Sequence, residues 1–234
     1  MRAGALVFFA VLFAAPLNAQ QSDPYQALVA ELASPEAFDL ALRRLLESDM
    51  PAAFRSDPDI AVLEEDCPGL IQALVNASTP MLTELNAQGL KEYRVSLRDL
   101  LAARLNADEA RQAADFFTSE LGRRFVRTVS AEATLGGSLT SSLSNEAGSI
   151  DRRAFEQDQQ ASVRSGLAAL SPADLQAVNM IFASDWGRAF AALSPEIQEL
   201  KYRLVNADLT PEQGATVEEL SAKAATAYLE ACEG

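Results

Sequence analysis

The polar residues of this sequence that could bind or react share one motif, a serine followed by a glycine and an arginine at fixed spacing. The motif occurs twice at an offset of 65 residues, as Ser119, Gly122 and Arg123 and again as Ser184, Gly187 and Arg188. A guanidinium one turn into a helix could bind an anion near the helix N-terminus. Alternatively, it could donate to the last carbonyls of the preceding helix or pair with an acid. These six are the candidate binding residues, and both interpretations of the arginines stay open.

Histidine is absent from all 234 residues, which excludes much familiar catalytic and metal chemistry. Hydrolases of the Ser-His-Asp and Cys-His kinds need an imidazole as their base. Zinc and haem sites built on histidine are excluded for the same reason. Cys67 and Cys232 are the only cysteines, and two are too few for a zinc cage. We therefore assign no catalytic residue, no metal site and no cofactor.

One carboxylate supports an alternative function, in which the protein cleaves cell-wall glycan. Glu47-Ser48, followed by the Gly-Leu-Ile-Gln of residues 69–72, resembles the Glu-Ser pair and Gly-Leu-Met-Gln run of helical lytic transglycosylases. A glutamate whose pKa is raised can protonate a glycosidic oxygen. The segment between the two runs contains prolines and acids where that family has a small-residue linker. A buried Glu47 at the base of a cleft would support this alternative, whereas an exposed Glu47 would exclude it.

The chain is strongly acidic, with a net charge of −14. Such a surface opposes polyphosphate partners, because their binding gains affinity from cations that release counterions. We therefore expect no nucleic acid partner. The acidic run Glu64-Glu65-Asp66 is typical of a solvated face, and it lacks the ligand spacing of a calcium loop. A metal buffer that uses the acidic excess would need a ligand spacing that the sequence does not show.

The two copies of the motif belong to longer segments, 105–125 and 170–190, that align without a gap. Each copy begins with a capping residue, Asn106 or Ser171, and has an acid three residues later, as in a capping box. The serine of the motif then predicts the start of a second helix after a sharp turn. The glycine in the first turn of that helix predicts a close approach between two backbones. Each copy is therefore predicted to be a helical hairpin, and the pair to be an internal duplication.

Large apolar residues accompany the motif at helical spacing in both copies. They are Phe117, Leu121, Phe125, Phe182, Trp186 and Phe190. Residues four apart lie on the same face of a helix. We predict that these six form the structural core of the repeat, because buried aromatic side chains more often build core than a ligand cage.

The corner pattern Phe-x-Ser-x-x-Gly-Arg-x-Phe, with the capped segment that leads into it, resembles bacterial proteins of the domain of unknown function 2059 family. The resemblance covers roughly residues 100–205. It implies an exported helical protein of unestablished function, with no catalytic residue to carry over. The family commonly has proline after the corner serine, whereas Glu120 and Asp185 follow it here. An acid also suits the first turn of a helix, since the helix dipole places partial positive charge there.

Helix start signals organise the rest of the chain. We expect helices over 24–32 and 35–48, a less regular stretch over 49–66, and a helical segment from Pro68 to Leu105 that Pro80 kinks or breaks. The Gly-Gly-Ser stretch after Leu135 predicts either a hinge or contact loop, or a continuing helix whose small residues pack on a neighbour. A final helix is expected after Thr210-Pro211. Together these signals predict an all-α fold, a helical array or bundle of hairpins.

The first 19 residues have the layout of a secretory signal peptide. A positive start is followed by an apolar run from Ala3 to Ala15, and small Ala19 precedes the expected cleavage point. The run is too short to span a bilayer, although an uncleaved N-terminal anchor is the alternative. In an exported protein an even cysteine count favours a disulfide between Cys67 and Cys232, the alternative being two unpaired buried thiols. We therefore expect a periplasmic or secreted protein with no membrane span after signal removal.

These signals divide the chain into four segments. They are the signal peptide over 1–19, an N-terminal helical region over 20–104, a duplicated hairpin domain over 105–205 with copies near 105–130 and 170–195, and a C-terminal helix over 206–234. The expected function is that of a non-enzymatic binding or assembly module of the cell envelope. Duplicated hairpins build extended surfaces or grooves, and no catalytic constellation is present. The partner is expected to be a protein or an apolar small molecule held between helices.

Overall fold

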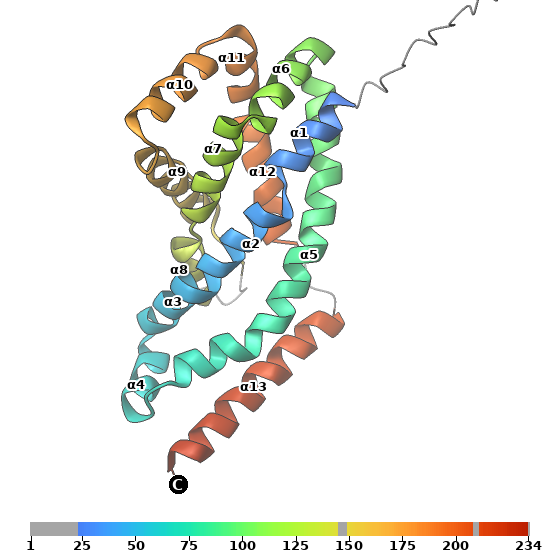
Figure 1. Ribbon diagram of the computed structural model, residues 1–234. Coiled ribbons are helices and arrows are strands. Elements are labelled where there is room, and N and C mark those ends of the chain that lie inside the picture. Colours follow the sequence, from blue (N-terminus) through green and yellow to red (C-terminus); the bar gives the residue numbers. More distant parts are fainter. Residues whose placement is uncertain (1–22, 145–148, 208–210, 234) are drawn as a thin grey trace, which may run out of the picture.

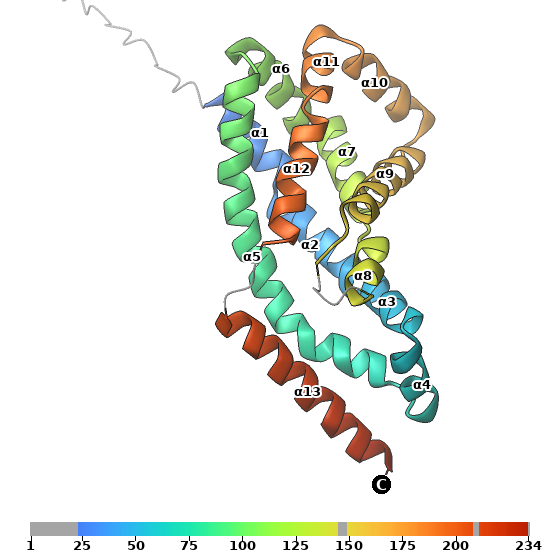
Figure 2. The same cartoon turned by 180° about the vertical axis from the view of Figure 1, so that it is seen from behind.

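All regular elements in the computed structural model are helices (Figures 1 and 2). The structure describes residues 23–144, 149–207 and 211–233. In chain order the elements are α1 (Pro24–Leu32), α2 (Pro35–Arg44), the π-helical turn η1 (Leu45–Asp49), α3 (Met50–Ser56), α4 (Pro58–Asp66), α5 (Leu70–Arg104), α6 (Ala107–Thr118), α7 (Glu120–Ala131), α8 (Gly136–Leu143), α9 (Arg152–Ala168), α10 (Pro172–Phe182), α11 (Asp185–Ala191), α12 (Ser194–Val205) and α13 (Pro211–Glu233). No strand occurs within these ranges, which confirms the all-α prediction.

The N-terminal part is more helical than the sequence predicts. α1 has the expected bounds, and the Asp23 carboxylate caps it by accepting from Tyr25 N. The stretch 49–66, expected to be less regular, instead forms α3 and α4. The π turn η1 carries the chain from α2 into α3. Pro58 stands at the first position of α4, where a missing N–H costs little. Pro51 is the second residue of α3, within a run of helical residues that is continuous with the π turn. Neither proline therefore interrupts the helices of the stretch.

α5 is a single helix of 35 residues that continues through Pro80. Just before the proline, the hydroxyls of Ser78 and Thr79 donate to the carbonyls of Leu74 and Val75, at 2.9 and 2.8 Å. Hydrogen bonds of this kind bend helices, and the first part of α5 runs at an angle to the rest (Figures 1 and 2). The helix therefore bends without the break that the sequence allowed.

The main core is shared by the N-terminal helices and the hairpins. Leu28 of α1, Leu97 of α5 and Phe117 of α6 belong to one cluster, and none is more than 1% exposed. Val178 of α10 and Leu193 belong to the same cluster. The core thus crosses the division expected at residue 105, so the N-terminal helices and the hairpins pack together.

The glycine-rich stretch does not continue the preceding helix, which corrects one of the two interpretations of it. α7 ends at Ala131, and α8 begins anew at Gly136. Asp158 of α9 caps α8 from outside, since its Oδ2 accepts from both the backbone N and the hydroxyl of Ser138, at 2.7 Å each. A carboxylate is favourable at a helix N-terminus. The stretch is therefore a contact segment that starts a helix.

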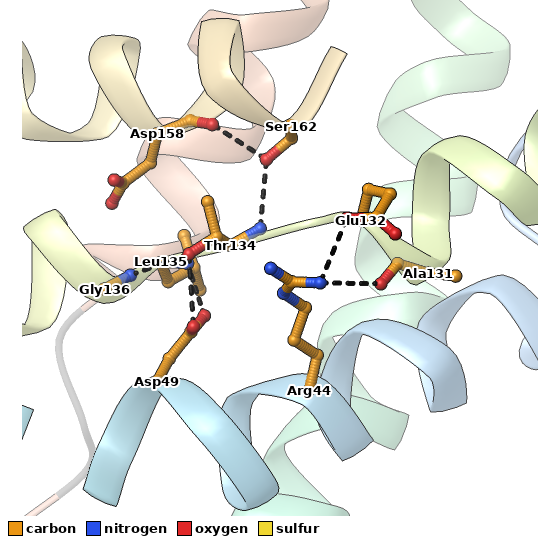
Figure 3. Close-up of polar contacts among 9 residues, drawn as sticks. All are labelled: Arg44, Asp49, Ala131, Glu132, Thr134, Leu135, Gly136, Asp158 and Ser162. Atoms are coloured by element: carbon orange, nitrogen blue, oxygen red, sulfur yellow. Dashed lines mark hydrogen bonds and ion pairs between the residues drawn. The ribbon is translucent and has the colours of Figure 1, made fainter. Parts of the chain in front are cut away.

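A second buried carboxylate, Asp49 of η1, holds the turn just before α8 (Figure 3). Its oxygens accept from Leu135 N at 2.7 Å and from Thr134 Oγ1 at 3.1 Å. Nearby, Arg44 pairs with Glu132 at 3.2 Å. These contacts attach the α7–α8 turn to α2 and η1.

α13 lies along the first part of α5 and leads to the C-terminal end of the chain (Figure 1). A disulfide joins Cys232 to Cys67, with 5.8 Å between their Cα atoms, which confirms the expected pairing. Tyr228 Oη also donates to Pro68 O, at 2.6 Å. The last helix is thereby tied to the first third of the chain. Within 23–144, 149–207 and 211–233, no helix combines the length and the apolar content needed to cross a bilayer.

Candidate functional site

The serines of the two corners each cap the second helix of a hairpin. Ser119 Oγ accepts from Gly122 N at 3.1 Å, and Ser184 Oγ accepts from Gly187 N at 3.2 Å. Each hydroxyl also donates to a carbonyl of the preceding helix, at 2.6 Å in both corners. The two corners are therefore alike in their local hydrogen bonding, while their origin by duplication stays a prediction.

The corner glycines stand where a side chain would collide with the first helix of the hairpin. A Cβ atom at Gly122 would lie 2.7 Å from Phe117 Cα, and one at Gly187 would lie 2.7 Å from Phe182 Cα. Non-bonded atoms do not approach this closely without displacement. The close backbone approach in each hairpin therefore requires glycine.

Both corner arginines are held by groups of the protein. Arg123 of α7 forms a bidentate ion pair with Glu31 of α1, with Nη2 and Oε1 2.9 Å apart, and this contact raises the pKa of Arg123. Arg188 donates to Ala183 O and pairs with Asp185. These contacts agree with the interpretation in which the corner arginines donate to the carbonyls of the preceding helix or pair with an acid. A ligand-binding role for the six corner residues stays a prediction.

The large apolar residues of the corners join the two hairpins through one aromatic cluster. Its members are Phe116, Phe117, Leu121, Phe125, Phe182, Trp186 and Phe190. Phe117 and Phe190, one from each hairpin, have ring centroids 5.2 Å apart. Phe116, which the sequence reasoning omitted, lies 6.0 Å from Trp186. The corners therefore build core, and the space available to a ligand lies elsewhere.

A cavity of about 350 Å³ lies between α2, α5, α7, α9 and α12. In Figure 2, α12 lies beside α5 and in front of α2. Most of the wall is apolar, with Phe38 from α2, Val129 from α7, Phe155 from α9 and Leu204 from α12. Ligand sites in proteins span about 300–1,000 Å³ and are lined mainly by apolar side chains. The cavity therefore has the size and the lining of a small-molecule site.

Lys201 of α12 is the only cation among the described residues that line the cavity. Within the described part of the chain, its amine has no carboxylate at ion-pair distance and no hydrogen bond. The residue keeps exposed surface at the edge of the cavity, yet the surrounding protein desolvates the amine and lowers its pKa. Perturbed groups of this kind cluster at functional sites.

Tyr93 of α5 also lines the cavity and is 4% exposed. Its ring packs against Phe38, with 5.7 Å between the centroids. Burial raises the pKa of its hydroxyl, which therefore stays a neutral donor. Tyr93 Oη has no hydrogen-bond partner among the described residues, and it is not fully enclosed by them, since Arg44 Nε is the buried side-chain atom there that lacks a partner. The hydroxyl of Tyr93 is a second polar group that a ligand could engage.

Asp49 is the only carboxylate in the described lining, and it is already engaged (Figure 3). One oxygen accepts from Leu135 N and the other from Thr134 Oγ1. Both oxygens of Asp49 therefore already hold the α7–α8 turn beside the cavity.

Gly89, in the middle of α5, leaves room for the cavity beside that helix. A Cβ atom at this position would meet no atom within 4 Å, so close packing does not require a glycine. The backbone does not require one either, since Gly69 is the glycine of the described residues with positive φ. A glycine inside a helix costs about 0.5–1 kcal/mol relative to alanine. Gly89 thus lowers local stability while it keeps one wall of the cavity open.

Glu47, the residue of the glycan-cleaving alternative, is exposed. It borders a second, more open hollow that Arg43 and Arg44 also line. An exposed carboxyl beside two arginines lacks the apolar surroundings that prepare a glutamate for acid catalysis. This position removes the basis of that alternative. Among the described residues, no group of three His, Cys, Asp or Glu side chains is arranged to hold a metal ion.

Sequence reasoning missed Lys201, Tyr93 and Gly89 as site residues. Two signals were present. Lys201 is one of three lysines in an acidic chain, and Gly89 interrupts a long helical pattern without any turn signal. Neither signal shows which helices meet, because α5 and α12 are far apart in the chain.

The comparison with known proteins identifies no relative. No family model, no curated protein and no solved structure matches this chain. The resemblance of the corners to the domain of unknown function 2059 family therefore stays a prediction, and the candidate site is defined by the geometry of the cavity.

Proposed function

We propose that this chain is a non-enzymatic helical binding protein of the cell envelope that holds an apolar small molecule between its helices. The observation that carries the proposal is the cavity between α2, α5, α7, α9 and α12, with a volume of about 350 Å³ and mostly apolar walls. Pockets of this size between packed helices are common ligand sites.

Exposed apolar side chains at the cavity support the same function. Val163 of α9 and Val205 of α12 line it and are 46% and 40% exposed. An apolar ligand would cover these side chains, and burial of apolar surface contributes about 25 cal/mol per Å². Binding would therefore remove unfavourable surface from both the ligand and the protein.

We further propose that the protein is exported to the periplasm or outside the cell. The signal-peptide layout of residues 1–19, which lie outside the described residues, and the Cys67–Cys232 disulfide support this. Mass spectrometry of the protein from fractionated cells provides the test. A chain that starts at Gln20 in the exported fraction would support the proposal, and a cytosolic chain that keeps Met1 would contradict it.

The neutral fluorophore N-phenyl-1-naphthylamine, which is brighter in apolar surroundings, tests the cavity as a binding site. We expect the protein to bind it saturably. Gly89→Phe would place a ring in the cavity and is expected to weaken binding by at least about tenfold, equivalent to roughly 1.4 kcal/mol. Ala87→Phe is the matched control, since Ala87 is exposed on the same helix and does not line the cavity.

Circular dichroism would first show that both variants keep the helical fold. Weaker binding by Gly89→Phe alone would support the proposal. No binding by the unchanged protein, or equal binding by both variants, would overturn it.

A further inference from the structure

We infer that the ligand of the cavity is an amphiphile, whose apolar body lies between the helices and whose carboxylate pairs with Lys201. This inference rests on the proposed function and adds the chemistry of the ligand's head group. It is carried by the placement of one cation without a partner in a mostly apolar cavity.

Lys201 is the group of the described lining that can supply a counter-charge to an anion. Within the described residues nothing pairs with its amine, so a ligand carboxylate would not have to displace a protein group. The carboxylate would also restore to the amine part of the stabilisation that desolvation removes. A charge-assisted contact of this kind is expected to change affinity about 10- to 100-fold.

Tyr93 adds a second donor to the same cavity. Tyr93 is 4% exposed as a residue, and no group among the described residues accepts the proton of its hydroxyl, which is not itself enclosed. A carboxylate has only acceptors to offer, and both Lys201 and Tyr93 offer donors. The cation of α12 and this hydroxyl of α5 are therefore complementary to an anionic head group.

A cationic head group is less compatible with the cavity. Asp49 is the carboxylate of the described lining, and its oxygens already accept at 2.7 Å from Leu135 N and at 3.1 Å from Thr134 Oγ1. A ligand cation would compete with the contacts that hold the α7–α8 turn. The site therefore distinguishes head groups by the sign of their charge.

The apolar wall suits the hydrocarbon part of the ligand. Phe155 and Leu204 form part of it, whereas Lys201 keeps exposed surface, as do Val163 and Val205. This arrangement places the carboxylate near the opening and the hydrocarbon between the helices. A carboxylate near the opening stays partly hydrated, which reduces the cost of pairing two charges inside a protein.

The net charge of the chain opposes the binding of an anion, so the predicted preference tests the local contacts in the cavity. With a net charge of −14, the protein repels anions and attracts cations at long range. A preference for an anionic amphiphile can therefore arise only from local contacts in the cavity.

Three ligands that share a dodecyl chain provide the test: dodecanoate, dodecanol and dodecyltrimethylammonium. Each is titrated below its micelle concentration at neutral pH, and its affinity is measured by displacement of N-phenyl-1-naphthylamine. For the unchanged protein we expect dodecanoate to bind at least about tenfold more tightly than dodecanol. The cationic ligand is expected to bind most weakly.

Lys201→Met removes the charge and keeps an unbranched side chain. We expect it to weaken dodecanoate binding about 10- to 100-fold and to leave dodecanol binding nearly unchanged. The variant is expected to fold, because Lys201 is exposed and pairs with no described residue. Lys91→Met is the matched control, since Lys91 is exposed on α5 and lies outside the lining. It is expected to leave all three affinities unchanged.

The two levels of the proposal can fail separately. Equal binding of dodecanoate and dodecanol, or equal losses in Lys201→Met and Lys91→Met, would overturn the inference about the head group. The proposed function would survive either result, because the neutral fluorophore reports on the apolar cavity alone. Failure of the fluorophore to bind would overturn the proposed function itself.

Discussion

At the scale of single residues, the interior uses most of its polar groups to hold the fold together. Asp158 accepts from Ser138 at the start of α8, and Asp49 accepts from Leu135 just before it. Lys201 and Tyr93 differ, because neither has a hydrogen-bond partner among the described residues. Folded proteins satisfy nearly all of their buried polar groups. The amine and the hydroxyl border the same cavity, where both are free to contact a ligand.

The lowered pKa of Lys201 predicts selective chemistry. A lysine is a nucleophile only when it is unprotonated, and a lower pKa increases the unprotonated fraction at any pH below the ordinary value of about 10.4. We expect brief treatment with acetic anhydride at mildly alkaline pH to acetylate Lys201 faster than Lys91 and Lys223. Mass spectrometry of peptides would measure the three rates. Equal rates at Lys201 and exposed Lys91 would contradict the prediction.

Asp158 provides a prediction about stability. Asp158→Ala would leave the backbone N and the hydroxyl of buried Ser138 without their acceptor. Each unsatisfied buried group costs about 1–3 kcal/mol, so the free energy of unfolding should fall by at least that amount. Urea unfolding measures the change. Asp151→Ala, which removes an exposed cap from α9, is the control and should cost only about 1 kcal/mol.

At the scale of the elements, glycine has two opposite roles in this chain. Gly122 lets α7 turn tightly against α6, where a Cβ would lie 2.7 Å from Phe117 Cα. Gly89 has open space around the position of its missing Cβ. One glycine is therefore required by packing, and the other weakens its helix beside a cavity.

This contrast predicts opposite effects of the same substitution. Gly89→Ala should raise the free energy of unfolding by about 0.5–1 kcal/mol, because alanine is the better helix former and meets no clash. Gly122→Ala should lower it by about 1–3 kcal/mol, the usual cost of overpacking. Urea unfolding of the two variants measures both changes. Changes of the same sign would show that the two environments have been misjudged.

At the scale of the whole molecule, α13 is attached mainly through α5 and the disulfide. It lies along the first part of α5, and Cys232 and Tyr228 connect it to Cys67 and Pro68 (Figure 1). The main core lies among α1, α5, α6 and the hairpins, and none of its described members comes from α13. Loss of the disulfide should therefore promote local unfolding of α13 far more than it promotes unfolding of the main core.

The Cys67→Ser and Cys232→Ser double variant tests this dependence. The chain-entropy model assigns a disulfide that closes so long a loop a contribution of up to about 5 kcal/mol. We expect amide hydrogen exchange in α13 to accelerate, while amides around Leu97 and Phe117 keep most of their protection. Equal acceleration in both regions would show that the disulfide stabilises the molecule as a whole.

Local hydrogen bonds made much of the fold predictable. Asp23 with Pro24 predicted the start of α1, and Ser119 and Ser184 predicted the hairpin corners, because a cap bonds a backbone N–H within three residues of itself. Pro51 misled the prediction for 49–66, since proline either starts or interrupts a helix, and the neighbouring π turn decided which. The disulfide was predictable because the chain has only two cysteines.

The sequence by itself thus determined many of the helices, the hairpin corners and the covalent tie between Cys67 and Cys232, but not the helices of the stretch 49–66. Only the tertiary structure showed that Lys201 of α12 and Tyr93 and Gly89 of α5 border one cavity. It also showed that Glu47 is exposed and that Arg123 is paired with Glu31. The physical reason is the distance along the chain over which each kind of interaction acts. Caps and helical periodicity act within a few residues along the chain, whereas a cavity depends on which distant helices pack together and where their side chains leave space.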